Sequence, residues 1–186
     1  QIEAATQALA KGARTGGARI FENTKVTRIR HNGDRITGVD TDDGSIDADY
    51  VVICGGMWTR DLAASVGVAA PLHACEHYYV LFEGVEGIDN TLPVLRDYDY
   101  CGYYKYDAGK LLVGAFEPNA RPWGMDGISE DFCFDEIAGS FEHFEPLLID
   151  AMRRVPALEK AGIQKFFCGP ESFTPDVRYH LGESAE

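Results

Sequence analysis

The sequence contains few basic residues and no long apolar run. Its 17 Lys and Arg residues are outnumbered by 30 Asp and Glu residues, which gives a net charge of −13 at pH 7. Nucleic acids and anionic membranes attract basic protein surfaces, so this charge argues against both as partners. No apolar stretch has the length of about 20 residues that a transmembrane helix needs. We therefore expect no nucleic-acid partner and no membrane partner.

The sequence also lacks the cysteine spacings of metal sites and disulfide frameworks. No Cys-x-x-Cys occurs, and the number of cysteines is odd: Cys54, Cys75, Cys101, Cys133 and Cys168. Several of them lie in apolar or aromatic runs, where a free cysteine behaves as a small hydrophobic residue. We expect no disulfides, no metal site and a reducing compartment, either a bacterial cytoplasm or a mitochondrial matrix.

The most informative stretch is an apolar run that ends in two glycines. Residues Tyr50–Ile53 show no alternation, which is typical of a strand buried on both faces. Gly55 and Gly56 follow, and a helix is predicted from Trp58 to Val66. Such a turn lets a ligand approach bare backbone, and the start of the helix offers free N–H groups to a phosphate. A tight strand–helix turn without a ligand explains these residues equally well.

The segment before this run predicts a helix, a short strand and a β-meander. Apolar residues recur at helical spacing up to Gly16-Gly17, which ends the predicted helix. The hairpin signals Asn32-Gly33 and Asp43-Gly44 join three alternating segments. The predicted strands before the apolar run cover residues 18–22, 25–30, 35–41 and 45–48.

From Ala69 onward the pattern becomes aromatic and rich in β-forming residues. Helical stretches are predicted within residues 131–155, with interruptions near Gly139 and Pro146. The predicted strands cover residues 76–82, 92–96, 102–106, 110–116 and 163–168. These patterns predict an α+β fold with an α/β part, in which a β-meander and a buried strand are joined to an antiparallel sheet with helices.

Five short blocks make this order of elements more specific: Cys75–Tyr79, Pro93–Asp97, Gly102–Lys105, Gly114–Pro118 and Gly169–Asp176. With these blocks the chain resembles the FAD-dependent amine oxidoreductases of the D-amino-acid oxidase type, in particular their dimethylglycine and sarcosine dehydrogenase branch. The resemblance implies that residues 1–70 are a partial FAD-binding domain. It also implies that residues 71–186 are a substrate-binding domain whose last residues lead back toward the FAD domain.

The chain departs from this family at its phosphate-binding motif. The fingerprint Gly-x-Gly-x-x-Gly is absent, and the glycine cluster at residues 12–17 has a different spacing. The family's N-terminal histidine, which can carry flavin covalently, is missing too, and the chain begins with Gln1. We expect an internal segment of a longer protein that binds little FAD by itself. For the whole protein the resemblance implies FAD, and tetrahydrofolate where a folate-binding region is present.

The resemblance assigns the chemistry to His77 and Tyr103. An unperturbed histidine titrates near neutral pH, so His77 is the candidate for taking the proton of the substrate amine. The family's tyrosine at Tyr103 sits by the flavin and the substrate, whereas Tyr104 should face the other side of the strand. The alternative for His77 is a buried strand histidine with one hydrogen bond. The alternative for either tyrosine is a core residue.

Further residues are assigned to the cofactor and the substrate. Val26 matches the meander residue whose backbone meets the adenine, although an inward strand valine fits as well. Gly55, Gly56 and Trp58 match the turn near the FAD; a core tryptophan is the alternative for Trp58. Arg96 follows an apolar strand and is a candidate partner for a substrate carboxylate. A surface ion pair with a neighbouring aspartate, Asp97 or Asp99, is the favoured alternative for this arginine.

The function implied is oxidation of an N-methylated glycine, dimethylglycine or sarcosine, to an iminium by hydride transfer to FAD. The implied partners are a small amine and, as electron acceptor, oxygen or an electron-transfer protein. One alternative is a non-catalytic relative that resembles the regulatory subunit of pyruvate dehydrogenase phosphatase. Another is an oxidase of a different secondary amine. We also expect residues 50–58 to form an exposed sheet edge through which the chain could dimerise.

Overall fold

The computed structural model describes residues 2–184 and divides the chain into two compact units. The first unit runs up to Ile53 and includes Ser65–Val68. The second unit comprises Cys54–Ala64 and the chain from Ala69 onward. None of the helices in the described part of the chain is long and apolar enough to cross a membrane.

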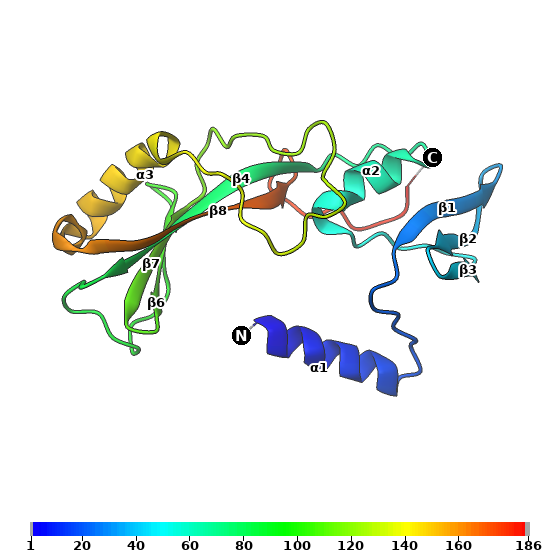
Figure 1. The fold of residues 1–186 in the computed structure, drawn as a ribbon, viewed down its shortest axis with the longest axis horizontal. Helices are drawn as coiled ribbons and strands as arrows, with labels where there is room; N and C mark the ends of the chain where they lie inside the picture. Colours follow the sequence, from blue (N-terminus) through cyan, green and yellow to red (C-terminus); the bar gives the residue numbers. More distant parts are fainter. Residues whose placement is uncertain (1, 185–186) are drawn as a thin grey trace. The chain divides into compact units, whose positions relative to one another are not determined.

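The first unit contains helix α1 and a three-stranded antiparallel meander in the order β1-β2-β3 (Figure 1). Both predicted hairpins form, and Gly33 and Gly44 adopt the positive φ values of 60° and 126° that their turns require. Helix α1 ends as predicted, with Gly17 at a φ of 94°. The elements are α1 Ile2–Thr15, β1 Val26–Asn32, β2 Arg35–Thr41 and β3 Gly44–Asp47.

Two predicted strands of this region do not form. Residues 18–22 and 50–53 belong to no sheet, and Tyr50 and Val52 are 82% and 81% exposed. A strand buried on both faces needs neighbouring strands for its N–H and C=O groups. None of the strands among residues 2–184 pairs with either segment. The predicted helix after the glycines is also shorter: a 3₁₀ turn, η1 Gly56–Trp58, leads into α2 Thr59–Ala64.

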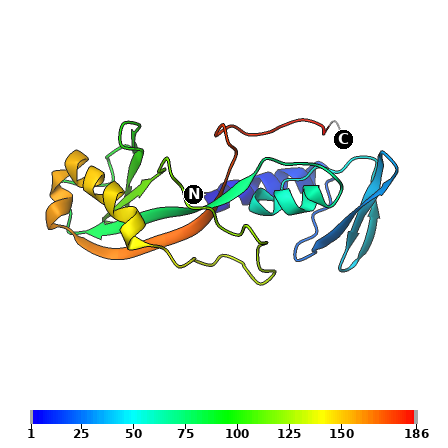
Figure 2. The ribbon, with the colours of Figure 1, turned by 90° about the horizontal axis from the view of Figure 1, so that it is seen from above.

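The second unit contains a five-stranded antiparallel sheet in the order β5-β6-β7-β4-β8 (Figures 1 and 2). Strands β4 and β8 are long and pair from His73↔Phe173 to Glu83↔Gly162. The predicted mixed fold with an antiparallel sheet is confirmed. The elements are β4 His73–Glu83, β5 Leu95–Asp97, β6 Gly102–Asp107, β7 Lys110–Ala115, α3 Phe141–Arg154, η2 Pro156–Lys160 and β8 Gly162–Phe173.

Three boundaries in this unit differ from the prediction. Strand β8 was expected to end at Cys168 but continues to Phe173, because β4 offers a partner along its whole length. Strand β5 has only three residues. Helix α3 starts after Ser140, whose hydroxyl accepts a hydrogen bond from the N–H of His143, and it continues through Pro146. Phe144 and Leu148, which flank this proline, are buried against the sheet and hold the helix together.

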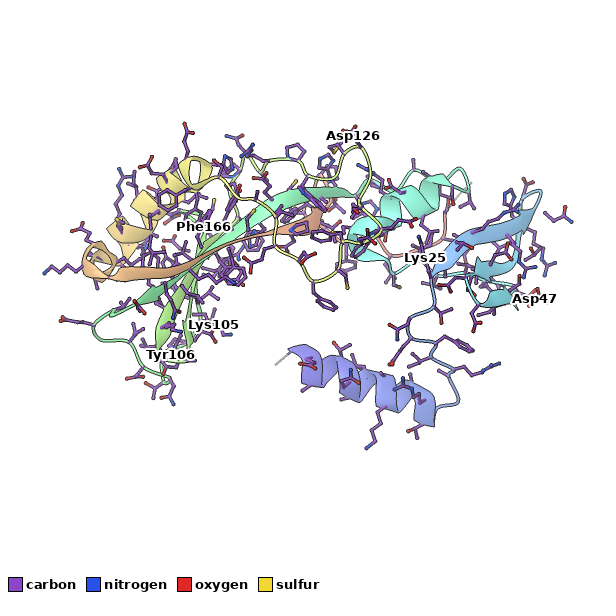
Figure 3. All side chains as sticks on the ribbon, in the orientation of Figure 1. Lys25, Asp47, Lys105, Tyr106, Asp126 and Phe166 are labelled. Carbon is purple, nitrogen blue, oxygen red and sulfur yellow. The ribbon has the colours of Figure 1, made fainter. Side chains whose placement is uncertain are left out.

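Helix α3 covers one face of the five-stranded sheet. Tyr78, Val80 and Phe82 of β4 point to this face, and side chains fill the space between the helix and the sheet (Figure 3). Burying one such aromatic or aliphatic side chain contributes about 1.5–3 kcal/mol. The other members of this core include Tyr104, Val113, Phe144, Leu148, Ala151, Leu158 and Cys168. All five cysteines of the chain are free thiols.

Candidate active site

The sheet face opposite α3 carries the polar and aromatic residues named in the sequence. Side chains alternate along a strand, so the residues next to the core positions point to this second face. The pairings Arg96↔Tyr103 and Tyr103↔Gly114 run across β5, β6 and β7, and Gly169 of β8 lies opposite His77 of β4. We refer to the face that carries these residues as the open face.

His77 and Tyr103 meet on the open face, although 26 positions separate them in the sequence. The Nε2 atom of His77 lies 3.0 Å from the hydroxyl oxygen of Tyr103, which is a hydrogen-bond distance. Their rings are nearly parallel, at 13°, with centroids 5.9 Å apart. Tyr104 points to the α3 side and is buried, as predicted. The structure therefore brings together the two residues that were predicted to carry the chemistry.

Two glycines shape the surface around this pair. A Cβ on Gly114 would lie 2.1 Å from Cζ of Tyr103, so the tyrosine ring occupies the space that a side chain on β7 would take. A Cβ on Gly169 would meet nothing within 4 Å. The space beside the imidazole of His77 is therefore open, while Tyr103 is packed directly onto the sheet.

The imidazole of His77 is held in its neutral form. Its side chain is 13% exposed, and the ring of Phe116 lies with its centroid 4.5 Å away. Burial, followed by the positive charge of Arg96, lowers the pKa of His77 to about 4. At neutral pH one ring nitrogen therefore accepts hydrogen bonds and the other donates.

Tyr103 keeps its proton over the whole physiological range. Burial is the first cause, and the negative charge of Glu171 adds to it, so that the pKa of Tyr103 rises to about 12. The phenol is a hydrogen-bond donor or acceptor toward His77, according to the imidazole tautomer. Its role in the site is one of hydrogen bonding, because a tyrosinate would need a much higher pH.

The side chain of Arg96 points to the open face and does not form the predicted surface ion pair. Its guanidinium carbon lies 4.2 Å from the ring centroid of Phe116 and 5.9 Å from that of Tyr103. The favoured expectation of an ion pair with Asp97 or Asp99 is wrong: Asp97 follows Arg96 directly and points to the opposite face, and Asp99 lies beyond the end of β5. Both aspartates pair with Arg154 of α3 instead. No ion pair of Arg96 occurs within residues 2–184, so its charge remains available on the open face.

Glu171 was not singled out from the sequence, yet it lies beside His77. Its Oε2 atom is 3.6 Å from Nε2 of His77, and its side chain is 46% exposed. Burial raises the pKa of Glu171, and the charge of Arg96 acts in the opposite direction. From the sequence, the strand was predicted to end at Cys168, which left Glu171 outside it. Glu171 reaches the open face only because β8 continues past Cys168 and its side chains keep alternating.

The residues predicted to touch the cofactor lie in both units. Gly55, Gly56 and Trp58 belong to the second unit, where η1 contacts β8 and Gly56 has a φ of 55°. Val26 belongs to the first unit, at the start of β1, and its side chain is exposed rather than inward. Their contacts to a cofactor stay predictions.

Comparison with known proteins identifies the family. The model of the family described as FAD dependent oxidoreductase (DAO) matches residues 1–186. The chain belongs to this family of FAD dependent oxidoreductases. The resemblance predicted from the five sequence blocks is therefore confirmed.

The curated relatives are much longer than this chain. The chain is 44% identical over 182 residues to 4-methylaminobutanoate oxidase (formaldehyde-forming) of Paenarthrobacter nicotinovorans, covering 98% of the chain and 22% of that protein. It is 40% identical over 183 residues to human mitochondrial sarcosine dehydrogenase, covering 96% of the chain and 20% of that protein. It is 37% identical over 180 residues to the mouse mitochondrial pyruvate dehydrogenase phosphatase regulatory subunit, covering 95% and 20%. The chain thus spans about a fifth of their length.

Solved structures support the fold. L-proline dehydrogenase from P. horikoshii superimposes with a TM-score of 0.74 at 22% identity, over 97% of this chain and 46% of that one. Glycine oxidase from Geobacillus kaustophilus gives a TM-score of 0.67 at 27% identity, over 97% and 44%. The chain therefore shares its fold with these two enzymes.

The resemblance implies that the flavin would lie against the open face. Tyr103 is packed onto the sheet at Gly114, and no atom lies within 4 Å of the position that a Cβ on Gly169 would take. No pyrophosphate seat of the Gly-x-Gly-x-x-Gly type occurs in the sequence. The resemblance implies that Tyr103 and the Gly55–Trp58 turn would border the flavin ring. When bound, the flavin supplies the hydride acceptor.

Proposed function

We propose that the protein carrying this chain oxidises N-methylated amino acids, and that the open face is the surface that receives the substrate. The observation that carries the proposal is the hydrogen-bond distance of 3.0 Å between His77 and Tyr103 beside an uncompensated arginine. The relatives named as sarcosine dehydrogenase and 4-methylaminobutanoate oxidase support the substrate class. Dimethylglycine and sarcosine are the first candidates, and a longer N-methyl amino acid is the next.

The substrate carboxylate is assigned to Arg96. A guanidinium offers two parallel N–H donors, which match the two oxygens of a carboxylate. The guanidinium lies against the rings of Phe116 and Tyr103, which restrict its position. A carboxylate bound there would orient the substrate so that its amine lies toward the His77–Tyr103 pair.

The proton of the amine is assigned to His77. Only the free base of the amine has the lone pair that assists departure of a hydride from the neighbouring carbon. In the free site the pKa of His77 is about 4, which makes the imidazole a weak base. A carboxylate on Arg96 would offset the second cause of that shift, so substrate binding should make His77 more basic. Tyr103 would hold the imidazole in place through its hydroxyl.

The test uses the full-length flavoprotein. Flavin reduction is followed without oxygen after adding sarcosine, dimethylglycine or 4-methylaminobutanoate, across a range of pH. His77→Asn should lower the rate constant of flavin reduction by about 10²-fold or more, the usual scale for a positioned acid–base group. Tyr103→Phe should cost about 1–3 kcal/mol of transition-state stabilisation, the scale of a buried partner left unsatisfied. Neither residue holds the pyrophosphate, so the flavin should stay bound in both variants.

His31→Asn is the matched control, because His31 is exposed and bonds only its own hairpin through the carbonyl of Gly33. It should leave the rate unchanged. Wild-type turnover by His77→Asn at every pH would make His77 a structural histidine. A second candidate function, a non-catalytic regulatory role, is favoured by the 37% identity to the phosphatase regulatory subunit. Failure of every amine to reduce the bound flavin would favour that candidate.

A further inference from the structure

Glu171 is a charged residue of the open face to which the proposed function assigns no role. Among residues 2–184 no Lys or Arg nitrogen lies within 4.0 Å of its carboxylate, and its Oε2 atom lies 3.6 Å from Nε2 of His77. Half of the side chain is shielded from water. An unneutralised carboxylate in such a place attracts a cation, because desolvation strengthens its field.

Opposite charges lie toward the two edges of the sheet. Arg96 is on the edge strand β5 and Glu171 is on the edge strand β8, with Tyr103 and His77 on strands between them. The charges of Arg96 and Glu171 influence each other across this face. A molecule with a carboxylate at one end and a cationic amine at the other would match this arrangement.

Aromatic rings lie on the open face near the end of β8 that carries Glu171. The centroid of Phe116 lies 4.5 Å from that of His77 and 6.2 Å from that of Phe173, which follows Glu171 by two positions on β8. The guanidinium of Arg96 already lies over Phe116, whereas no Lys or Arg within residues 2–184 lies over Phe173. Methylated ammonium groups favour such surroundings, since they are weakly hydrated cations with apolar methyl surfaces. Gly169 lies opposite His77 and two positions before Glu171 on β8, and a Cβ at this glycine would meet nothing within 4 Å, so space for such a group is open there.

We propose that Glu171 determines specificity for the amine end of the substrate: its carboxylate, with the ring of Phe173, binds the methylated ammonium group beside His77. This assignment rests on the proposed function for the identity of the site. It further specifies that the substrate first binds as a cation, with its amine protonated, and then loses this proton to His77. The other charged and titratable groups on this face near His77 are Arg96, Tyr103, Tyr79 and Cys75.

The experiment compares two unreactive probes in the full-length flavoprotein by titration calorimetry. Glycine betaine has a carboxylate and a permanent trimethylammonium charge. Methylthioacetate has the same carboxylate but an uncharged thioether in place of the ammonium group. Glu171→Gln should weaken betaine about 3- to 5-fold, the scale of one ion pair at a half-exposed site, and should leave methylthioacetate nearly unchanged. Arg96→Gln should weaken both probes.

Glu145→Gln is the matched control. Glu145 is exposed on α3, so this variant removes the same charge from the opposite side of the sheet. It should change neither probe. Unchanged betaine binding in Glu171→Gln, or equal weakening of both probes, overturns the proposal. If Glu171→Gln does not fold, wild-type protein decides: the preference for betaine over methylthioacetate should fall as salt is raised, and a salt-independent preference refutes a role for charge.

These measurements need no turnover. The proposed function fails if His77→Asn oxidises amines at the wild-type rate, whatever the probes do. The assignment of Glu171 fails if Glu171→Gln leaves the affinity for betaine unchanged, whatever the rate of amine oxidation. The two failures are therefore distinguishable. Glu171→Asp, which keeps the charge on a shorter side chain, should restore part of the affinity for betaine, and no restoration would also count against the assignment.

Discussion

Replacing Gly114 with alanine would test whether the sheet itself holds Tyr103 against His77. The added Cβ would lie 2.1 Å from Cζ and 2.2 Å from the hydroxyl oxygen of Tyr103. Non-bonded carbon atoms sit about 3.5 Å apart or more, so one of the two groups must move by more than about 1 Å. Gly114 pairs with Tyr79 on one side and Tyr103 on the other, which fixes the β7 backbone. The tyrosine ring must therefore be the group that moves.

The expected result has two parts. Overpacking at a site of this kind costs about 1–3 kcal/mol of unfolding free energy. A shift of this size also breaks the 3.0 Å contact between Tyr103 and His77, so the rate should fall at least as far as in Tyr103→Phe. The double variant Gly114→Ala/Tyr103→Phe should be no slower than Gly114→Ala alone, because both changes remove the same contact.

The assays are urea unfolding followed by fluorescence, and anaerobic flavin reduction by the amine. Gly169→Ala is the control for stability: the same change on the same face, at a position where a Cβ meets nothing within 4 Å. Its unfolding free energy should stay within about 0.5 kcal/mol of wild type. Wild-type stability and rate in Gly114→Ala would refute the view that Tyr103 is packed onto the sheet at this glycine.

Three further predictions concern the core and the titration of the site. Phe144→Ala should lower the unfolding free energy by about 3–5 kcal/mol in denaturant titrations, because Phe144 is fully buried between α3 and the sheet. Gly139→Ala should cost about 1–3 kcal/mol in the same assay, since its Cβ would lie 2.7 Å from Cβ of Cys168. Because the pKa of His77 falls from 6.5 to about 4 on folding, the unfolded chain binds the extra proton between these values. Protonation of the unfolded chain should therefore lower the unfolding free energy by at most about 3 kcal/mol as the pH falls from 6.5 toward 4, whereas above pH 6.5 the folded chain keeps its full stability. Unfolding measured at each pH should show this fall in the wild type and not in His77→Gln.

Elements with local signals could be predicted from the sequence. The hairpins at Asn32-Gly33 and Asp43-Gly44 form because a two-residue turn with positive φ depends only on the residues in it. The end of α1 at Gly17 has the same origin. The apolar run at Tyr50–Ile53 does not become a strand, because a strand exists only with a partner and the described chain supplies none. Local composition alone carries no information about that partner.

The extent of β8 shows why the site was only partly predictable. The strand was predicted to end at Cys168, and Pro170, which has no N–H donor, lies beyond that end. Its partner in the sheet is Glu76, whose own N–H donates to the carbonyl of Arg121, on the side away from β8. Pro170 therefore occupies a position on an edge strand where no donor is needed, and β8 continues to Glu171. His77 and Tyr103 were identified by the resemblance, whereas Glu171, Gly114 and Gly169 become visible only through strand register.

The register of the sheet couples the core to the site. Each pair of consecutive residues divides between the two faces: His77 and Tyr103 lie on the open face, and Tyr78 and Tyr104 lie in the core under α3. A slip of one residue in β6 would exchange Tyr103 and Tyr104, which would take the hydroxyl away from His77 and expose a core ring. The free energy of burying Tyr78, Tyr104 and their neighbours under α3 opposes that slip. The packing of the helix on one face of the sheet thus fixes the register that keeps His77 and Tyr103 together on the other face.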